Sequence, residues 1–213
     1  TAPSSGQNFP QIVTHILQKA FFKHALAKVK SQEDCHMEET LQDLKTRRSC
    51  RKYKPDQISE EQLNEILEAG TYAPTGMGAQ SPIIVVVQDK KTRDYISKLN
   101  AKVMGSAGDP FYGAPTVLVV LADRSRGTYV DDGNLVIGNL LNAAHAIGVD
   151  SCYIYRAREV FNSEEGKALL AKWGITGDYE GIGNVILGYG LPEGIKKAAP
   201  RKDSYVIRIK EEE

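Results

Sequence analysis

Residues 46–53 read Thr-Arg-Arg-Ser-Cys-Arg-Lys-Tyr, a strongly basic stretch. Its four cations surround one hydroxyl, that of Ser49: Arg47, Arg48, Arg51 and Lys52. Guanidinium groups bind phosphate or carboxylate oxygens through paired, charge-assisted hydrogen bonds, so the cluster predicts an anion site. The alternative is a solvated basic turn at the end of a short amphipathic helix, because positive side chains suit a helix C-terminus.

Two features elsewhere in the chain favour the binding site. A second basic pair, Arg201-Lys202, follows Pro200, and a turn rich in glycine and proline spans residues 72–82. Glycines bring backbone N–H groups close to a ring or a phosphate, because no side chain intervenes.

Length and composition predict a single globular domain without a metal or nucleic-acid site. The 213 residues are 41% hydrophobic, and 27 basic residues balance 27 acidic ones, so no global charge attracts nucleic acid. Three cysteines without CxxC spacing argue against disulfides and zinc. No apolar run reaches the length of a membrane span and no secretory signal is evident. We therefore expect reduced thiols and a cytoplasmic protein.

Residues 1–36 differ in character from residues 37–213. Apolar residues at helical spacing, with lysines around them, predict a basic amphipathic leader helix. Such a helix suits a membrane surface or a partner. A cloning origin is the alternative, because His36-Met37 resembles the junction that a common cloning site leaves.

The remaining pattern mixes strands and helices without strict alternation, which predicts an α+β class with a central sheet. A capping box at Ser59–Gln62 starts a helix that Gly70 is expected to end in a left-handed conformation. Further helices are expected over 92–104, 134–147 and 162–173, and strands over 83–87, 116–121, 152–155, 183–189 and 205–209. Helix 134–147 is apolar almost all round, which indicates a central or interface position.

The sequence offers groups that bind but no evident acid, base or nucleophile. Walker A, Rossmann and nucleophile-elbow patterns are absent. Cys50 lies among arginines, which would lower its thiol pKa, yet no base stands beside it, so a bystander is the alternative. A site of this kind usually leaves the chemistry to a cofactor.

Five ordered motifs resemble those of the FMN-dependent nitroreductase family: residues 47–53, 73–80, 152–157, 181–189 and 200–202. The resemblance implies a mostly antiparallel central sheet flanked by helices. It also implies an intertwined homodimer with FMN in the interface, NADH or NADPH as electron donor, and helix 134–147 at the dimer seam.

Carried over by position, the resemblance implies thirteen cofactor-binding residues. They are Arg47, Arg48, Ser49, Arg51, Pro74, Thr75, Gly76, Met77, Tyr155, Arg156, Gly188, Arg201 and Lys202. Arg51 is also the candidate stabiliser of the reduced flavin. Two positions depart from the family pattern: Gly78 stands where many members carry asparagine, and Tyr155 where short members often carry histidine.

The activity implied is reduction of nitroaromatics, quinones or similar electron-poor small molecules by NAD(P)H, with ping-pong kinetics. The alternatives are a specialised reaction on the same fold, such as reductive dehalogenation or flavin-consuming chemistry, and a non-catalytic flavin-binding protein.

Overall fold

The computed structural model describes residues 39–210, in two units. In the first unit, residues 1–46, the described segment is a helix over 39–46, near whose end Thr46 Oγ1 donates a hydrogen bond to Gln42 O at 2.7 Å. The predicted leader, 1–36, lies outside the described residues, so its helix remains a prediction. The second unit begins at Arg47 and contains the sheet.

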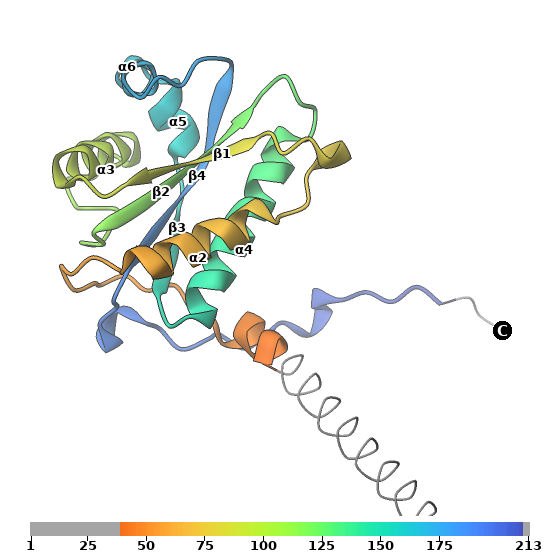
Figure 1. The fold of residues 1–213 in the computed structure, drawn as a ribbon. Helices are drawn as coiled ribbons and strands as arrows, with labels where there is room; N and C mark the ends of the chain where they lie inside the picture. Colours follow the sequence, from red (N-terminus) through yellow and green to blue (C-terminus); the bar gives the residue numbers. More distant parts are fainter. Residues whose placement is uncertain (1–38, 211–213) are drawn as a thin grey trace, which may run out of the picture. The chain divides into compact units, whose positions relative to one another are not determined.

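One antiparallel sheet forms the centre of the second unit, in the strand order β1-β2-β4-β3 (Figure 1). Its strands are β1 (Pro82–Val87), β2 (Thr116–Asp123), β3 (Asp150–Ile154) and β4 (Tyr179–Gly188). The central strands β2 and β4 are almost wholly buried. A strand covered on both faces needs apolar residues at every position, which explains the continuous apolar run in β2.

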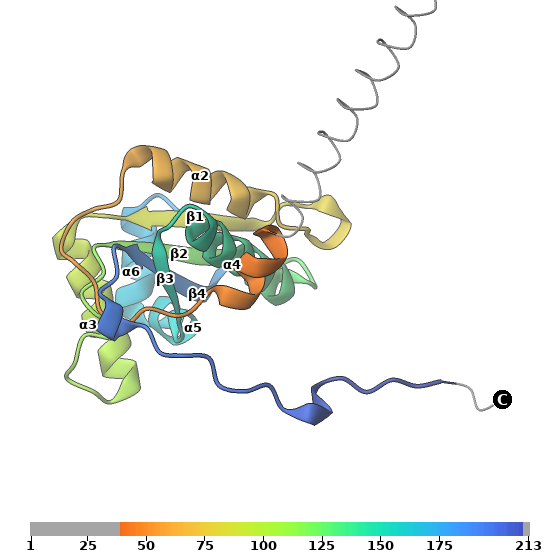
Figure 2. The same ribbon diagram turned by 90° about the horizontal axis from the view of Figure 1, so that it is seen from below.

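Helices cover both faces of this sheet (Figures 1 and 2). α2 (Glu60–Thr71) and α4 (Tyr129–Ala146) pack on the face that carries Leu118 and Val120. α3 (Lys90–Met104), α5 (Ala157–Asn162) and α6 (Glu164–Lys172) pack on the face that carries Val117 and Val119. Successive strand residues point to opposite faces, so β2 supplies both cores. Three short 3₁₀ helices complete the description: η1 (Gly76–Gly78), η2 (Pro192–Gly194) and η3 (Asp203–Tyr205).

The predicted class and most predicted elements are confirmed. Ser59 and Gln62 form the capping box, since each side chain accepts a hydrogen bond from the other residue's backbone N–H. α3 begins at Lys90, two residues before the prediction, because Asp89 caps it by accepting from Thr92 N. α4 begins at Tyr129 and so includes Asp131-Asp132-Gly133, which the prediction left outside. Gly148, at φ 75°, follows the C-cap of α4.

Two predicted features are wrong, and α5 was not predicted. Gly70 is not left-handed: α2 continues to Thr71, and a Cβ on Gly70 would lie 2.6 Å from Leu140 Cδ2. This glycine therefore permits close packing of α2 on α4. The strand over 205–209 does not form. Its apolar side chains are 68% to 91% exposed, and no strand of the described chain pairs with them.

Candidate functional site

The first basic motif is fixed between the start of β3 and the loop after β4. Cys50 N donates to Ser151 O at 3.0 Å, and Arg51 N donates to Gly194 O at 2.9 Å. Ser49 bridges Ser151 in parallel, and Tyr53 bridges Gly190 in antiparallel fashion. The backbone of the motif is thus held as an additional strand-like segment at the open edge of β3.

Within residues 39–210, two buried polar atoms of this segment and β3 have no hydrogen-bond partner: Arg47 Nη1 and Ser151 Oγ. Buried donors are almost always satisfied in folded proteins, so the unsatisfied guanidinium nitrogen of Arg47 marks a place for an acceptor. A phosphate fits this donor set, because guanidinium groups bind its oxygens through charge-assisted hydrogen bonds. Ser151 was not among the predicted site residues, because its place beside the motif depends on the pairing of Ser49 with β3.

Cys50 is a buried structural thiol at this edge. Its Sγ lies 3.1 Å from Lys52 O in a hydrogen bond. Burial raises the pKa of the Cys50 thiol, and the nearby Asp150 carboxylate adds to the rise. The lowered pKa that the neighbouring arginines suggested is therefore wrong, and Cys50 is the bystander of the two alternatives.

The glycine-rich turn is held by Asp132, a buried residue in the first turn of α4. Gly76 N donates to Asp132 Oδ1 at 2.9 Å, and Thr128 Oγ1 donates to Asp132 Oδ2 at 3.0 Å. Ser81 Oγ also donates to this carboxylate, at 3.5 Å. Asp132 was not among the predicted site residues, and an acidic residue in the first turn of a helix was its only signal in the sequence.

The tip of this turn points into solvent. Met77 is fully exposed at φ 55°, and Gly78 follows at φ 65°. Glycine and asparagine both adopt this left-handed conformation readily, so the departure at Gly78 changes a side chain without straining the backbone. Pro74 is exposed and Thr75 is half-buried, with Thr75 Oγ1 accepting from Gln80 N at 3.0 Å.

Tyr155 and Arg156 form a corner between β3 and α5. Arg156 has φ 79°, which is unusual for a residue with a side chain. The buried amide of Asn100 donates to Tyr155 O at 2.8 Å, and the buried amide of Asn184 donates to Ile154 O at 3.4 Å. The Arg156 guanidinium carbon lies 5.8 Å from the centre of the Tyr155 ring.

Five of the predicted residues therefore lie at the two ends of β3. Arg47, Arg48 and Ser49 lie near its first residues, and Tyr155 with Arg156 follows its last. Four residues separate Ser151 from Tyr155, or about 13 Å of strand. This spacing suits a phosphate at one end and a ring at the other. Gly188 lies near the first end, packed so that a Cβ would be 3.0 Å from both Tyr53 Cδ1 and Pro115 Cδ.

The other predicted residues do not join this arrangement within the described chain. The turn at Gly76 contacts α4, and no hydrogen bond links it to the first motif within residues 47–210. Arg201 and Lys202 are exposed. Arg201 Nη2 donates a hydrogen bond to Ala199 O at 3.0 Å, and Lys202 Nζ lies 5.7 Å from the centre of the Tyr205 ring.

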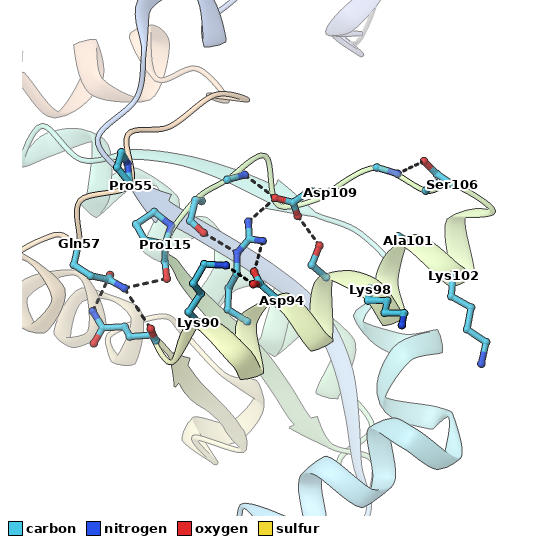
Figure 3. A pocket seen from close by; sticks show the side chains of 17 residues that line it. Pro55, Gln57, Lys90, Asp94, Lys98, Ala101, Lys102, Ser106, Asp109 and Pro115 are labelled. Carbon is cyan, nitrogen blue, oxygen red and sulfur yellow. Dashed lines mark hydrogen bonds and ion pairs between the residues drawn. The ribbon is translucent and has the colours of Figure 1, made fainter.

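A cavity of about 890 Å³ lies elsewhere, along α3 and the loop 105–115 (Figure 3). Arg93 is central to it, and its guanidinium donates to Asp94, Asp109 and Ala114 O. Since these polar groups already pair with one another, the cavity contains no unsatisfied donor comparable to Arg47. None of the predicted site residues lines it.

The fold is of the α+β class, and a basic motif with a buried, unpartnered guanidinium nitrogen lies beside its antiparallel sheet in the described chain. The model of the nitroreductase family matches residues 44–189. The chain belongs to this family.

Individual relatives agree with the family match. A protein of Archaeoglobus fulgidus, provisionally named NADH dehydrogenase/NAD(P)H nitroreductase, is 33% identical over 163 residues, which cover 74% of this chain and 88% of that protein. An FMN reductase [NAD(P)H] of Bacillus subtilis is 34% identical over 91 residues, 42% of this chain and 34% of that protein.

Among solved structures, a Bacteroides fragilis nitroreductase with bound FMN is 26% identical with a TM-score of 0.74, covering 80% of this chain and 98% of that one. Within residues 39–210, no helix has the length and apolar character needed to span a membrane.

Proposed function

We propose that this protein binds FMN and uses NAD(P)H to reduce nitroaromatics, quinones or similar electron-poor acceptors. The observation that carries the proposal is the buried Arg47 Nη1, which lacks a hydrogen-bond partner in the motif that resembles a flavin phosphate site. For a nitro compound, one hydride from NAD(P)H and one proton from solvent would convert the nitro group to nitroso, with one oxygen leaving as water.

Residues at the two ends of β3 would hold the cofactor. Arg47, Arg48 and Ser49 would bind its phosphate, and the unsatisfied hydroxyl of Ser151 extends this donor set. Tyr155 and Arg156 would face its ring. When bound, FMN would carry two electrons from the donor to the acceptor. Donor and acceptor would use the same open face in turn, which predicts ping-pong kinetics.

Arg51 would provide charge at the edge of the ring. Its backbone is fixed by the hydrogen bond to Gly194 O, while its side chain is exposed and forms no ion pair within residues 39–210. A preorganised cation stabilises negative charge that develops beside it. Protons would come from water, so no buried acid is required.

The active form would be a homodimer. Two observations support it. Tyr205, Val206, Ile207 and Ile209 are exposed in the single chain, although residues of this kind favour a sheet. The turn around Met77, together with Arg201 and Lys202, does not reach the first motif of its own chain, so these residues would complete the site of the other chain. α4, which leaves Leu135 exposed, would lie at the seam.

We place this function in the cytoplasm, because both cysteines of the described chain, Cys50 and Cys152, are free and buried thiols. Reduced thiols are the rule in that compartment.

The test begins with the absorbance spectrum of the purified protein, which should show bound flavin. NADH or NADPH should then be consumed only when an acceptor such as a quinone is added. Arg47→Ala and Arg201→Ala should each retain less flavin than Lys54→Ala, a control that removes an exposed cation beside the same motif. Equal flavin content in all three variants, or a colourless protein that takes up no FMN, would refute the proposal.

Dimerisation is tested separately by light scattering. Ile207→Lys combined with Ile209→Lys should convert a dimer of the full chain to a monomer. A monomeric unsubstituted chain would contradict the proposed assembly.

A further inference from the structure

The backbone of Arg156 adopts a conformation that is unfavourable for a residue with a side chain. Arg156 lies at φ 79°, where glycine is unstrained and an arginine is not. Non-glycine residues in this region concentrate at functional sites, held there by their surroundings. An arginine at a position that suits glycine therefore points to a use for the guanidinium.

The surroundings of this corner determine its backbone. Val160 N donates to Arg156 O at 3.0 Å, which starts α5. One residue earlier, the fully buried Asn100 donates to Tyr155 O at 2.8 Å. Asn184, also fully buried, donates to Ile154 O. These three bonds hold consecutive carbonyl groups, so the direction of the Arg156 side chain is set by the fold.

The Arg156 guanidinium itself has no anionic partner. It forms no ion pair and no side-chain hydrogen bond within residues 39–210, and its nearest ring is that of Tyr155, 5.8 Å away. The next arginine behaves differently: Arg158 pairs with Glu180 at 3.3 Å. Arg156 is thus a half-buried cation beside a Tyr155 ring that is 60% exposed.

We infer that Arg156 selects electron acceptors that carry a negative charge, specifically planar aromatic carboxylates. The Tyr155 ring would offer a flat apolar surface to the acceptor, and the guanidinium would bind the carboxylate through two hydrogen bonds. This inference rests on the proposed function and names its substrate class. Asn100 acts as a positioning residue, because it holds the carbonyl that precedes Arg156.

The test compares charged and neutral ligands of nearly equal shape. In calorimetric titrations of the FMN-loaded protein, benzoate should bind roughly tenfold more tightly than benzamide, as expected for one charge-assisted pair. In steady-state assays with NADH, 4-nitrobenzoate should exceed 4-nitrobenzamide in kcat/KM by a similar factor.

Arg156→Gly is the decisive variant, because glycine fits φ 79° and the fold should be preserved. Both preferences for the carboxylate should fall to within about twofold of unity when each rate is expressed per bound FMN, because Arg156 is also one of the residues proposed to face the flavin ring. Arg158→Gln, which removes the same charge two residues away, should keep the preferences.

Four outcomes would overturn the inference. They are equal use of both nitro compounds by the unsubstituted protein, equal binding of benzoate and benzamide by the unsubstituted protein, an unchanged preference per bound FMN in Arg156→Gly, and loss of the preference in Arg158→Gln as well. Failure to reduce either nitro compound would instead refute the proposed function, and this inference with it.

Discussion

Removal of the Asp132 carboxylate should loosen the glycine-rich turn and destabilise the fold measurably. This side chain is 2% exposed and accepts hydrogen bonds from Gly76 N at 2.9 Å and Thr128 Oγ1 at 3.0 Å. The bond from Ser81 Oγ, at 3.5 Å, is at the limit of hydrogen bonding and adds little.

The expected loss of stability follows from the hydrogen bonds that Gly76 N and Thr128 Oγ1 donate to Asp132. A hydrogen bond to a charged group contributes about 1.5–3 kcal/mol. The hydroxyl of Thr128, an exposed residue, can turn to water, whereas Gly76 N–H would lose the acceptor it has in the described chain. We therefore expect Asp132→Ala to lower the free energy of unfolding by about 3 kcal/mol. Asp132→Asn keeps an acceptor for Gly76 N and should cost about 1 kcal/mol.

Urea unfolding, followed by the fluorescence of the single tryptophan, Trp173, measures these differences. Asp131→Ala is the matched control, because it removes an exposed carboxylate from the same helical turn. Limited proteolysis within residues 76–80 should also be faster in Asp132→Ala. The reasoning is refuted if Asp132→Ala is no less stable than Asp131→Ala.

Four further predictions concern the scaffold. Burial would raise the pKa of Asp109, but hydrogen bonds from Arg93, Ser97 and backbone N–H groups outweigh burial and hold the pKa below its usual value. The ionised carboxylate therefore contributes its full stabilisation of the fold above about pH 4. This stabilisation is lost as the pH falls through the lowered pKa. Asp109→Asn should flatten the acid side of a plot of unfolding free energy against pH, and an unchanged slope would contradict the assignment. Gly148→Ala should lower the free energy of unfolding in urea by about 1 kcal/mol, because φ is 75° there, although no atom lies within 4 Å of the added Cβ. Gly166→Ala should fail to fold, because its Cβ would overlap Val160 O. A stable Gly166→Ala protein would disprove this packing. Leu140→Ala, at a fully buried position, should lower the free energy of unfolding by about 2–5 kcal/mol. A loss below about 1 kcal/mol would show that α2 and α4 can move together and fill the cavity left by Leu140.

The sequence predicted those parts of the fold that depend on nearby residues. The capping box at Ser59 involves residues three positions apart, and the buried strands are continuous apolar runs, so both could be predicted from the sequence. Gly70 was misread because a glycine near a helix end looks the same whether it ends the helix or admits Leu140 from α4. The 205–209 segment has strand-forming residues, yet a strand also needs a neighbour, which the described chain does not provide.

The residues of the candidate site likewise fall into those that local sequence identifies and those that depend on distant contacts. Arg47 and Ser49 could be named because the basic cluster is local. Ser151, Asp132 and Asn100 could not, since each acquires its role from a contact with a residue at least 50 positions away or on another element. The left-handed conformation of Arg156 also has no signature in composition or periodicity.

The exposed Met77 makes the turn a chemical reporter of its surroundings. A thioether in open solvent is readily oxidised to the sulfoxide, whereas a covered one reacts slowly. Met104, 40% exposed on α3, provides an internal reference within the same molecule. The ratio of peroxide oxidation at these two methionines, read by mass spectrometry at increasing protein concentration, would therefore record when another surface closes over the turn.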